Sequence, residues 1–373
     1  MEPVNLLIAG GGHASLPLIK MGLIWKQKKN LTVTLVSAEP WLVYSGALPQ
    51  YLGGFYEWQQ TSVNLEKLCK RYGTTFVKAY VTSVHPEEKN ITLSTGETLP
   101  FDILVINVGS KTPVASQLPN VYPVKPMSRL LSLREKLDEG TIRNLLITGA
   151  GAAGTEFALN LSHPLRKSRP QITLLEQTDR ILSAFPLKAA QTAQRILTER
   201  GVDILTDVTY TEDMATGYDA VILATGTEPS SLSIDHPFET GSGGRILTDQ
   251  TLLVHNQDSI FAAGDTADII GFNLPPVGVH AVNQGKILRE NMEAFTGNTE
   301  LKTFKPLPVT PLIISNGPDH AISTAGSFTI SGRSQARLKY LLDMRWMEKY
   351  TLPASRRRSV FRLLRDAGRR SRL

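Results

Sequence analysis

The chain contains two glycine-rich turns, and each lies between an apolar segment and a stretch compatible with a helix. The first turn covers residues 10–15 (GGGHAS) and follows VNLLIA; the second covers residues 149–154 (GAGAAG) and follows NLLIT. In both copies a second apolar segment ends 27 positions after the first glycine, at Ser37 and at Glu176. This spacing is typical of a β-α-β unit whose turn binds a pyrophosphate through backbone N–H groups at a helix start.

The repetition extends to the ends of both units. Each closes with Asp, a buried strand and a turn glycine seven residues after the Asp, in FDILVINVGSKTP at Gly109 and in YDAVILATGTEP at Gly226. We therefore predict an α/β fold with two Rossmann-like dinucleotide-binding domains, one inserted in the other, and a small C-terminal α+β domain. The predicted boundaries are 1–115 with 245–300 for the first domain, 116–244 for the inserted domain, 301–350 for the C-terminal domain and 351–373 for a tail.

Local patterns predict the remaining elements. TEFALNLSHPL predicts a helix over 155–165, and GVHAVNQGKILRENM predicts another directly after a Pro-Pro pair. The alternation of apolar and polar residues over 301–330 predicts an antiparallel sheet. Residues 333–349 predict a helix that has on one side Leu338, Leu341, Leu342 and Trp346.

Composition indicates where the protein is located. No apolar run approaches the ~20 residues that span a bilayer, and the N-terminal sequence lacks the features of a secretory signal. The single cysteine, Cys69, excludes an intrachain disulfide and favours a reducing compartment. We therefore expect a cytoplasmic protein in which Cys69 is a packed helix residue.

The basic character of the chain lies in its last residues. Of the net charge of +6, residues 356–373 contribute +7 from eight Arg and one Asp, which leaves −1 for the rest. On a helix, Val360, Phe361, Leu364 and Ala367 fall near one side of this segment, which favours a basic amphipathic anchor at an anionic membrane surface. The alternative is a disordered, solvated end that binds RNA or nothing.

Five motifs in a fixed order give the chain a family resemblance: GGGHAS, YSGALP, GAGAAGTEF, ATGTEP and FAAGD. With them, residues 4–350 resemble the two-dinucleotide flavoproteins of the FAD-dependent pyridine nucleotide-disulfide oxidoreductase family. The similarity is greatest to the type II NADH dehydrogenases and to the flavoprotein module found fused to selenide, water dikinase. The resemblance implies that the first turn holds FAD, that the second holds NADH, and that a hydride passes from NADH to the flavin.

The resemblance also implies which residues contact FAD. Asp265 is the expected ligand of the ribityl chain. The helix start at Val277 and Gly278 is expected at the pyrimidine carbonyl, where its partial positive charge stabilises the reduced flavin. At the ribose, either Ser37 or Glu39 is expected. The other expected contacts are Gly10, Gly12, His13, Ala14, Leu48, Pro49, Val81, Gly109 and Gly264.

In the second unit an acid stands at the position where a ribose contact is expected. Glu176 ends the second strand, so its carboxylate is expected to accept hydrogen bonds from the adenosine ribose hydroxyls. A carboxylate repels a 2′-phosphate, which favours NADH over NADPH, although Arg180 is close in sequence. The resemblance adds as nucleotide contacts Gly149, Gly151, Ala153, Glu156 and Gly226.

Two residues are candidates for catalytic roles. By resemblance, Glu156 lies near the nicotinamide and the flavin and handles a proton or orients the ring. The alternative is that Glu156 is simply an acid stabilised by the helix dipole in the first turn of a helix. Gln284 falls where related quinone reducers have a glutamine near the quinone. His13 is expected beside the pyrophosphate, with a helix-start histidine bonded to the backbone as the alternative. No metal site is expected.

The segment YSGALP (44–49) bears on the electron acceptor. It occupies the place where disulfide reductases have redox cysteines, and it has none, so we expect a diffusible acceptor, preferably a quinone. A quinone reducer is expected at the cytoplasmic face of the membrane, with 301–350 as a candidate homodimer interface. The alternatives are a soluble NAD(P)H oxidoreductase that reduces oxygen, a selenium species or a protein carrier, and a non-catalytic NADH-sensing flavoprotein. No nucleic acid partner is expected.

Overall fold

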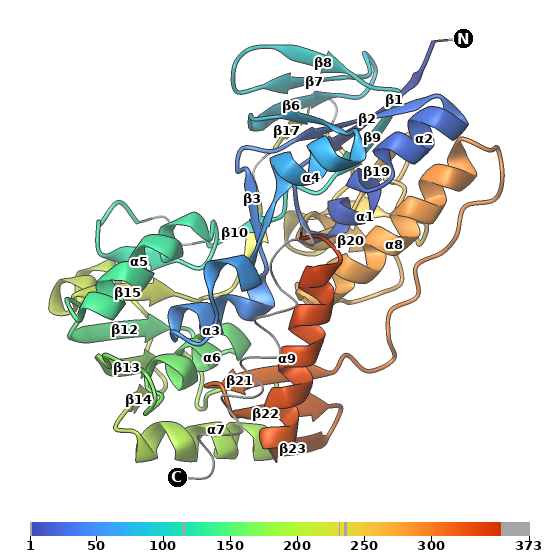
Figure 1. Ribbon diagram of the computed structural model, residues 1–373. Helices are drawn as coiled ribbons and strands as arrows, with labels where there is room; N and C mark the ends of the chain where they lie inside the picture. Colours follow the sequence, from blue (N-terminus) through green and yellow to red (C-terminus); the bar gives the residue numbers. More distant parts are fainter. Residues whose placement is uncertain (1, 114–115, 231, 235–236, 352–373) are drawn as a thin grey trace.

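The computed structural model describes residues 2–113, 116–230, 232–234 and 237–351 (Figure 1). The basic segment 356–373 lies outside the described residues, and with it the choice between an amphipathic anchor and a solvated end. Two five-stranded sheets form the framework, and each has one of the glycine-rich turns after one of its strands.

The first sheet is parallel throughout and has the order β19-β9-β1-β2-β5. Because β9 is buried along its whole length and β1 along most of it, they form nearly continuous apolar runs rather than alternating patterns. The strands are β1 (Val4–Ala9), β2 (Leu31–Val36), β5 (Thr75–Val77), β9 (Ile103–Ile106) and β19 (Ile260–Ala262).

The second sheet repeats this arrangement with the order β11-β15-β12-β13-β14. It shares one hydrophobic core with the helices α5 (Ser128–Glu139), α6 (Ala152–Leu161) and α7 (Leu187–Glu199). Its strands are β11 (Val121–Pro123), β12 (Asn144–Thr148), β13 (Gln171–Leu175), β14 (Asp203–Leu205) and β15 (Ala220–Leu223). The predicted α/β fold with two Rossmann-like units is confirmed.

Helix α6 differs from its prediction at both ends. The expected helix ran over 155–165, whereas α6 begins at Ala152, directly after its N-cap Gly151, and ends at Leu161. The early end has a local cause, because the residue before Pro164 is sterically disfavoured in helical conformation. The helix therefore starts inside the glycine-rich turn, with its N-terminal N–H groups at the turn.

The two segments that connect the first unit with the second lie next to each other. The short strands β10 (Ser110–Lys111) and β16 (Glu228–Pro229) pair there in antiparallel fashion. Soon afterwards β17 (Ser233–Ile234) joins the sheet of β6 (Val81–His85), β7 (Asn90–Leu93) and β8 (Thr98–Pro100). The chain has thus returned to the first unit by residue 233. The predicted domain boundaries stay predictions.

The C-terminal part forms the predicted antiparallel sheet followed by a helix. The strands are β21 (Leu312–Asn316), β22 (His320–Ala325) and β23 (Phe328–Gly332), and the helix is α9 (Arg333–Glu348). Strand β21 packs on α6, β22 packs on α7, and α9 packs on β22, so the sheet lies between the second unit and α9 (Figure 1).

The predicted apolar side of α9 is not its buried face. Leu338, Leu341 and Leu342 are 44%, 58% and 52% exposed, whereas Trp346, one turn after Leu342, is buried. The buried side contains the ion pair of Lys339 and Asp343 as well as methionines. Hydrophobic periodicity misses such a face, because it assigns charged residues to solvent.

The remaining elements are short, apart from α8 (Gly278–Phe295), which packs on the first turn. They are α1 (Leu16–Ile19), α2 (Gly22–Lys29), β3 (Trp41–Val43), α3 (Leu48–Leu52), β4 (Ser62–Asn64), α4 (Leu65–Tyr72), β18 (Ile246–Thr248) and β20 (Ala267–Ile269). None of the helices in the described ranges has the length and apolarity that a membrane span requires.

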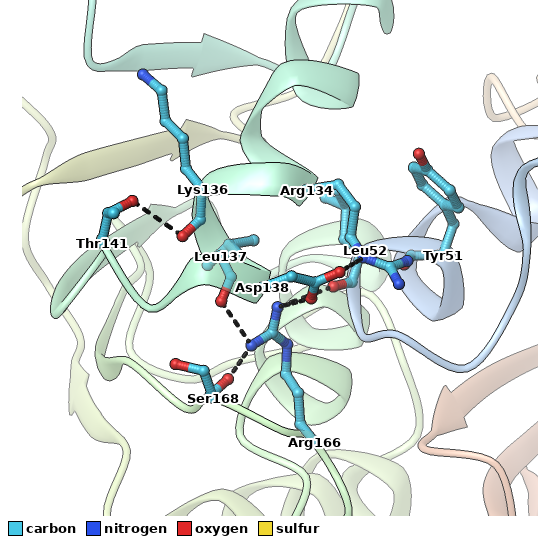
Figure 2. A network of polar contacts seen from close by, with 9 residues as sticks. All are labelled: Tyr51, Leu52, Arg134, Lys136, Leu137, Asp138, Thr141, Arg166 and Ser168. Atoms are coloured by element: carbon cyan, nitrogen blue, oxygen red, sulfur yellow. Dashed lines mark hydrogen bonds and ion pairs between the residues drawn. The ribbon is translucent and has the colours of Figure 1, made fainter.

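A buried arginine ties α3 of the first unit to the second unit (Figure 2). The guanidinium of Arg166 donates to Leu137 O at 3.2 Å and to Leu52 O at 3.5 Å, and pairs with Asp138 at 3.0 Å. Asp138 also pairs with Arg134 at 2.5 Å. These bonds connect the end of α3 with α5, so they hold the segment that begins with YSGALP against α5 of the second unit.

Candidate active site

Both glycine-rich turns open into one cavity of about 810 Å³. Its wall also includes parts of the segments 42–49 and 124–127 and the start of α8. The predicted residues on this wall are Gly12, His13, Leu48, Pro49, Gly109, Gly149, Gly151, Ala153, Glu156, Glu176, Gly226, Gly264, Asp265, Val277 and Gly278. The fold therefore brings the residues predicted for two different cofactors to one place.

The first turn is held by a close backbone contact and by side-chain hydrogen bonds. Gly10 has a φ of +100°, and a Cβ there would overlap the main-chain oxygen of Asn107, directly after β9. Ser15 Oγ donates to Gly10 O at 2.7 Å, and the side-chain amide of Asn107 lies 2.9 Å from Ser15 Oγ. The serine at the third glycine position thus ties the helix start to the turn.

Helix α8 covers this turn at close backbone distance. A Cβ at Gly285 would lie 2.6 Å from Ala14 O, so only glycine fits there. At the preceding position, Gln284 Oε1 accepts a hydrogen bond from Gly264 N at 2.6 Å, and Gln284 is only 3% exposed. Gln284 therefore holds the turn after β19, and its role near a quinone stays a prediction.

Asp265 belongs to a polar network that sequence reasoning missed. Its carboxylate accepts from Ser110 Oγ at 2.7 Å and pairs with the ammonium of Lys125. Burial raises the pKa of Asp265, but Lys125 and the hydrogen bond from Ser110 lower it by more. Lys125 follows β11 of the second unit, and no local pattern marks it as a partner of a residue 140 positions away.

Several predicted residues lie off the cavity wall. Ser37 Oγ donates to Glu39 O at 2.9 Å, and Glu39 is exposed. Val81 begins β6 and pairs with Leu93. Gly10, Ala14 and Gln284 are likewise behind the wall rather than on it. The roles of these residues in FAD binding, including the choice between Ser37 and Glu39, stay predictions.

The second turn is held by a contact between two of its glycines and by a carboxylate at the end of a strand. Gly149 has a φ of +88°, and a Cβ on Gly154 would overlap Gly149 O. Glu176 Oε2 accepts from Ala150 N at 2.7 Å, and its Oε1 accepts from Thr178 N at 3.1 Å. The carboxylate is therefore fixed at the end of β13, on the cavity wall and 7% exposed.

Glu156 connects the cavity to the C-terminal sheet. Its Oε1 accepts from the backbone N of Ser315 at 2.8 Å and from Ser315 Oγ at 2.6 Å. Burial raises the pKa of Glu156, while Lys339 and the bonds from Ser315 oppose the shift. A carboxyl group with a raised pKa on a cavity wall is a candidate for proton transfer.

Aromatic rings surround His13. Tyr44 stacks on Trp346 with centroids 4.4 Å apart, and the His13 ring lies 5.2 Å from Trp346. Burial, together with the charge of Lys125, lowers the pKa of His13 to about 4, so the ring is neutral at pH 7. Its Nε2 is buried and has no hydrogen-bond partner among the described residues. The predicted bond of a helix-start histidine to the backbone is therefore not made by Nε2.

These features fit an FAD in the first half of the cavity. The backbone at Gly10 and Gly12 leaves no room for side chains at the turn, as close approach to a pyrophosphate requires. The unpartnered Nε2 of His13, the carboxylate of Asp265 and the N-terminus of α8 offer polar groups to a ligand.

A fold with two parallel-sheet units whose pyrophosphate turns share one cavity defines a protein that binds two dinucleotides next to each other. The family described as pyridine nucleotide-disulphide oxidoreductase matches residues 4–285, and the chain belongs to this family. It is an FAD-dependent NAD(P)H oxidoreductase, and the prediction of FAD and NADH as its cofactors is confirmed.

Individual relatives are distant but similar in length. A type II NADH:quinone oxidoreductase of Staphylococcus aureus (strain NCTC 8325 / PS 47) is 23% identical over 91% of this chain and 94% of its own. The sulfide:quinone oxidoreductase of Aquifex aeolicus has a TM-score of 0.76 at 17% identity, over 93% of this chain and 91% of its own. NDH2 of Plasmodium falciparum in complex with NADH has a TM-score of 0.74 at 14% identity, over 94% and 99%.

Proposed function

We propose that this chain oxidises NADH and passes two electrons to a quinone at a membrane surface. The observation that carries the proposal is the shared cavity, in which both pyrophosphate turns and the carboxyl group of Glu156 meet. Bound FAD supplies the two-electron chemistry there. The residues of the chain bind and orient the two nucleotides and exclude water from the contact between them.

The polar groups of the cavity support a separate place for each nucleotide. FAD is held by the first turn, by Asp265 and by the start of α8, with His13 beside the pyrophosphate. NADH is held by the second turn, with its adenosine ribose at Glu176. Since the Glu176 carboxylate is fixed by backbone N–H groups, it cannot turn away from a 2′-phosphate, which favours NADH over NADPH.

A diffusible acceptor is favoured because the chain has no dithiol. Its single cysteine, Cys69, is fully buried in the core around the first sheet, and burial raises the pKa of its thiol to about 12. It therefore stays a protonated, packed thiol. The electrons must leave to a molecule that enters the protein from outside, and several relatives are named quinone reductases.

The outer face of α9 supports a membrane-bound acceptor. Leu338, Leu341 and Leu342 are exposed there, between the exposed Arg337 and Arg345. Apolar and cationic side chains on one helix face suit the interface of an anionic membrane. The arginine-rich residues 356–373 follow soon afterwards in the sequence and would add to the attraction.

Strand β23 extends this apolar surface. Phe328 and Ile330 are 77% and 60% exposed. Ile330 pairs with Ser323, whose Oγ is 2.6 Å from Gln335 of α9, so Ile330 lies on the sheet face that carries the helix. The two exposed side chains thus lie on the same side of the sheet as α9.

The proposal is tested by kinetics and by vesicle binding of the full chain. We expect NADH to be consumed with menadione much faster than with oxygen alone, and the protein to sediment with vesicles of phosphatidylglycerol but not of phosphatidylcholine. Replacing Leu338, Leu341 and Leu342 by Ser, or removing residues 352–373, should weaken this binding. The exposed Leu23 and Ile24 on α2, changed to Ser, serve as the matched control.

Three results would contradict the proposal. Equal rates with and without menadione would favour oxygen or another soluble acceptor. Vesicle binding that is absent, or unchanged in the leucine variant, would remove the membrane from the proposal and leave a soluble oxidoreductase or a homodimer interface at α9. Tight NADH binding with slow turnover for every acceptor would favour a sensor.

A further inference from the structure

A buried ion pair belongs to α9, which packs on β21, the strand whose Ser315 binds Glu156. This pair has no role in the binding of either nucleotide described above. Lys339 and Asp343 are 5% and 3% exposed, and Lys339 Nζ is 3.0 Å from Asp343 Oδ2. Lys339 Nζ also donates to Gly46 O at 2.5 Å, in the segment YSGALP. The pair therefore connects α9 with the cavity wall, on which Gly46 lies.

Asp343 is the most fully bonded member of this cluster. Besides Lys339, it accepts from Tyr56 OH at 3.2 Å and from the hydroxyl of Tyr44. Burial raises the pKa of Asp343, while Lys339 and the two tyrosines oppose that shift. Burial also raises the pKa values of Tyr44 and Tyr56, so both hydroxyls keep their protons and donate.

Glu156 interacts electrostatically with this pair but forms no ion pair with Lys339. Within the described chain, no ion pair joins Glu156 to Lys339, and only the Oε1 atom of Glu156 has hydrogen-bond partners, both on Ser315. Burial lowers the pKa of Lys339, but Asp343 and then Glu156 raise it by more. The side chain of Glu156 lines the cavity, where it can reach a bound molecule.

The charges of the cluster do not balance if every carboxyl group is ionised. One ammonium group faces two carboxyl groups, and Asp343 binds it directly while Glu156 does not. An unpaired charge in a buried site is costly, and the lower-energy arrangement keeps the second carboxyl group protonated. The charged or titratable groups that face Glu156 are Lys339 and Asp343 of α9 and Tyr44 of the YSGALP segment.

We propose that Asp343 is a positioning residue: by holding the Lys339 ammonium, it keeps Glu156 protonated and able to supply a proton to the reduced acceptor. This inference rests on the proposed function. Oxidation of NADH by a quinone gives NAD⁺ and a quinol; the hydride supplies two electrons and one proton, and the second proton comes from solvent. Glu156 is the group that passes this second proton on and then regains one from solvent.

Charge variants of α9 should move the pH dependence of turnover in opposite directions. A proton donor must be protonated, so the rate falls as the pH rises through its pKa. In Asp343→Asn, Lys339 has only Glu156 as an acidic partner, so the fall should move to lower pH by about 1–2 units. In Lys339→Met, two buried carboxyl groups remain without a cation, so the fall should move to higher pH.

The experiment measures kcat with NADH and menadione from pH 5 to 9 for the FAD-loaded full chain. The double variant Lys339→Met with Asp343→Asn should return the profile toward that of the wild type, because the net charge of the pair is restored. Glu156→Gln should lack the fall altogether. Glu348→Gln, on the outer side of the same helix, removes a carboxylate without touching the cluster and should leave the profile unchanged.

An infrared spectrum gives a readout besides activity. The C=O band of a protonated carboxylic acid should be present at neutral pH, absent in Glu156→Gln, and should disappear at lower pH in Asp343→Asn than in the wild type. If either single variant lowers kcat without moving the profile or the band, or if both variants move them the same way, the inference is wrong. Failure of the proposed function is a separate result, since NADH would then not bleach the flavin of the wild type.

Discussion

The two glycine-rich turns perform the same local task with different residues. In the first, Ser15 and Asn107 hold the turn by side-chain hydrogen bonds, and α8 covers it at backbone contact. In the second, Gly154 packs directly on the backbone of Gly149, and a strand-end carboxylate binds the turn. In this second turn, a Cβ added to Gly151 would have no atom of another segment within 4 Å, so the space in front of it is open.

This difference suits two ligands with different residence times. A turn covered by a long helix and surrounded by buried polar groups suits a cofactor that stays bound. A turn with open space in front of it suits a substrate that must enter and leave in every cycle. The comparison predicts that equivalent substitutions in the two turns have different consequences.

The largest effect is expected at Gly10. Any side chain there overlaps Asn107 O, and its φ of +100° is strained for other residues by about 1–3 kcal/mol. We expect Gly10→Ala to be purified without flavin and to be inactive. Absorbance of the purified protein, before and after incubation with FAD, measures this; a yellow, active variant would show that the first turn is not the FAD site.

The matched change in the second turn is Gly154→Ala. Its Cβ would overlap Gly149 O, so the turn must open and nucleotide binding should weaken by at least about tenfold, which corresponds to 1.4 kcal/mol. The protein should nevertheless stay yellow. Titration with NADH measures the affinity, and loss of flavin from this variant would contradict the separation of the two sites.

Glu176→Gln should change nucleotide preference while keeping an acceptor for Ala150 N. Without the negative charge, repulsion of a 2′-phosphate disappears, and the preference for NADH over NADPH should fall roughly tenfold. The ratio of kcat/KM for the two nucleotides measures this. Glu199→Gln, on the exposed side of α7, is the control. An unchanged ratio would mean that Glu176 does not meet the ribose.

The smallest effect is expected at Ser15. Ser15→Ala loses the bond to Gly10 O, which is worth about 0.5–1.5 kcal/mol, so FAD affinity should fall between two- and tenfold. Ser15→Gly, which restores the usual third glycine, should lose the same bond. Fluorescence titration of the apoprotein with FAD measures both variants. Unchanged affinity in both would show that this bond does not hold the turn.

Much of the fold follows from local sequence patterns. The turns, the buried strands beside them and the antiparallel C-terminal sheet were predicted, because each depends on glycine conformation or on runs of apolar residues. Part of the cavity wall followed from the family motifs, whereas other lining residues, such as Lys125 and Met127, were not predicted. The C-terminal end of helix α6 was predicted too late, because the residue before Pro164 is disfavoured in helical conformation.

Contacts between distant segments were not predictable in the same way. Lys125 meets Asp265 across 140 residues, and Lys339 meets Gly46 across 293. Nothing in the sequence near these lysines indicates a buried partner, and the apolar side predicted for α9 did not include Lys339. Buried ion pairs depend on which segments the tertiary structure brings together, so the electrostatics of the site can be derived only from the structure.

The central claim is that the first turn holds a resident FAD and that the second admits NADH to the same cavity. The most direct test is an anaerobic absorbance titration of the purified full chain, first with NADH and then, on a fresh sample, with NADPH. The claim predicts a yellow protein whose flavin band is bleached by about one equivalent of NADH and only slowly by NADPH. A flavin that stays oxidised with NADH, or a colourless protein that cannot be loaded with FAD, would contradict it.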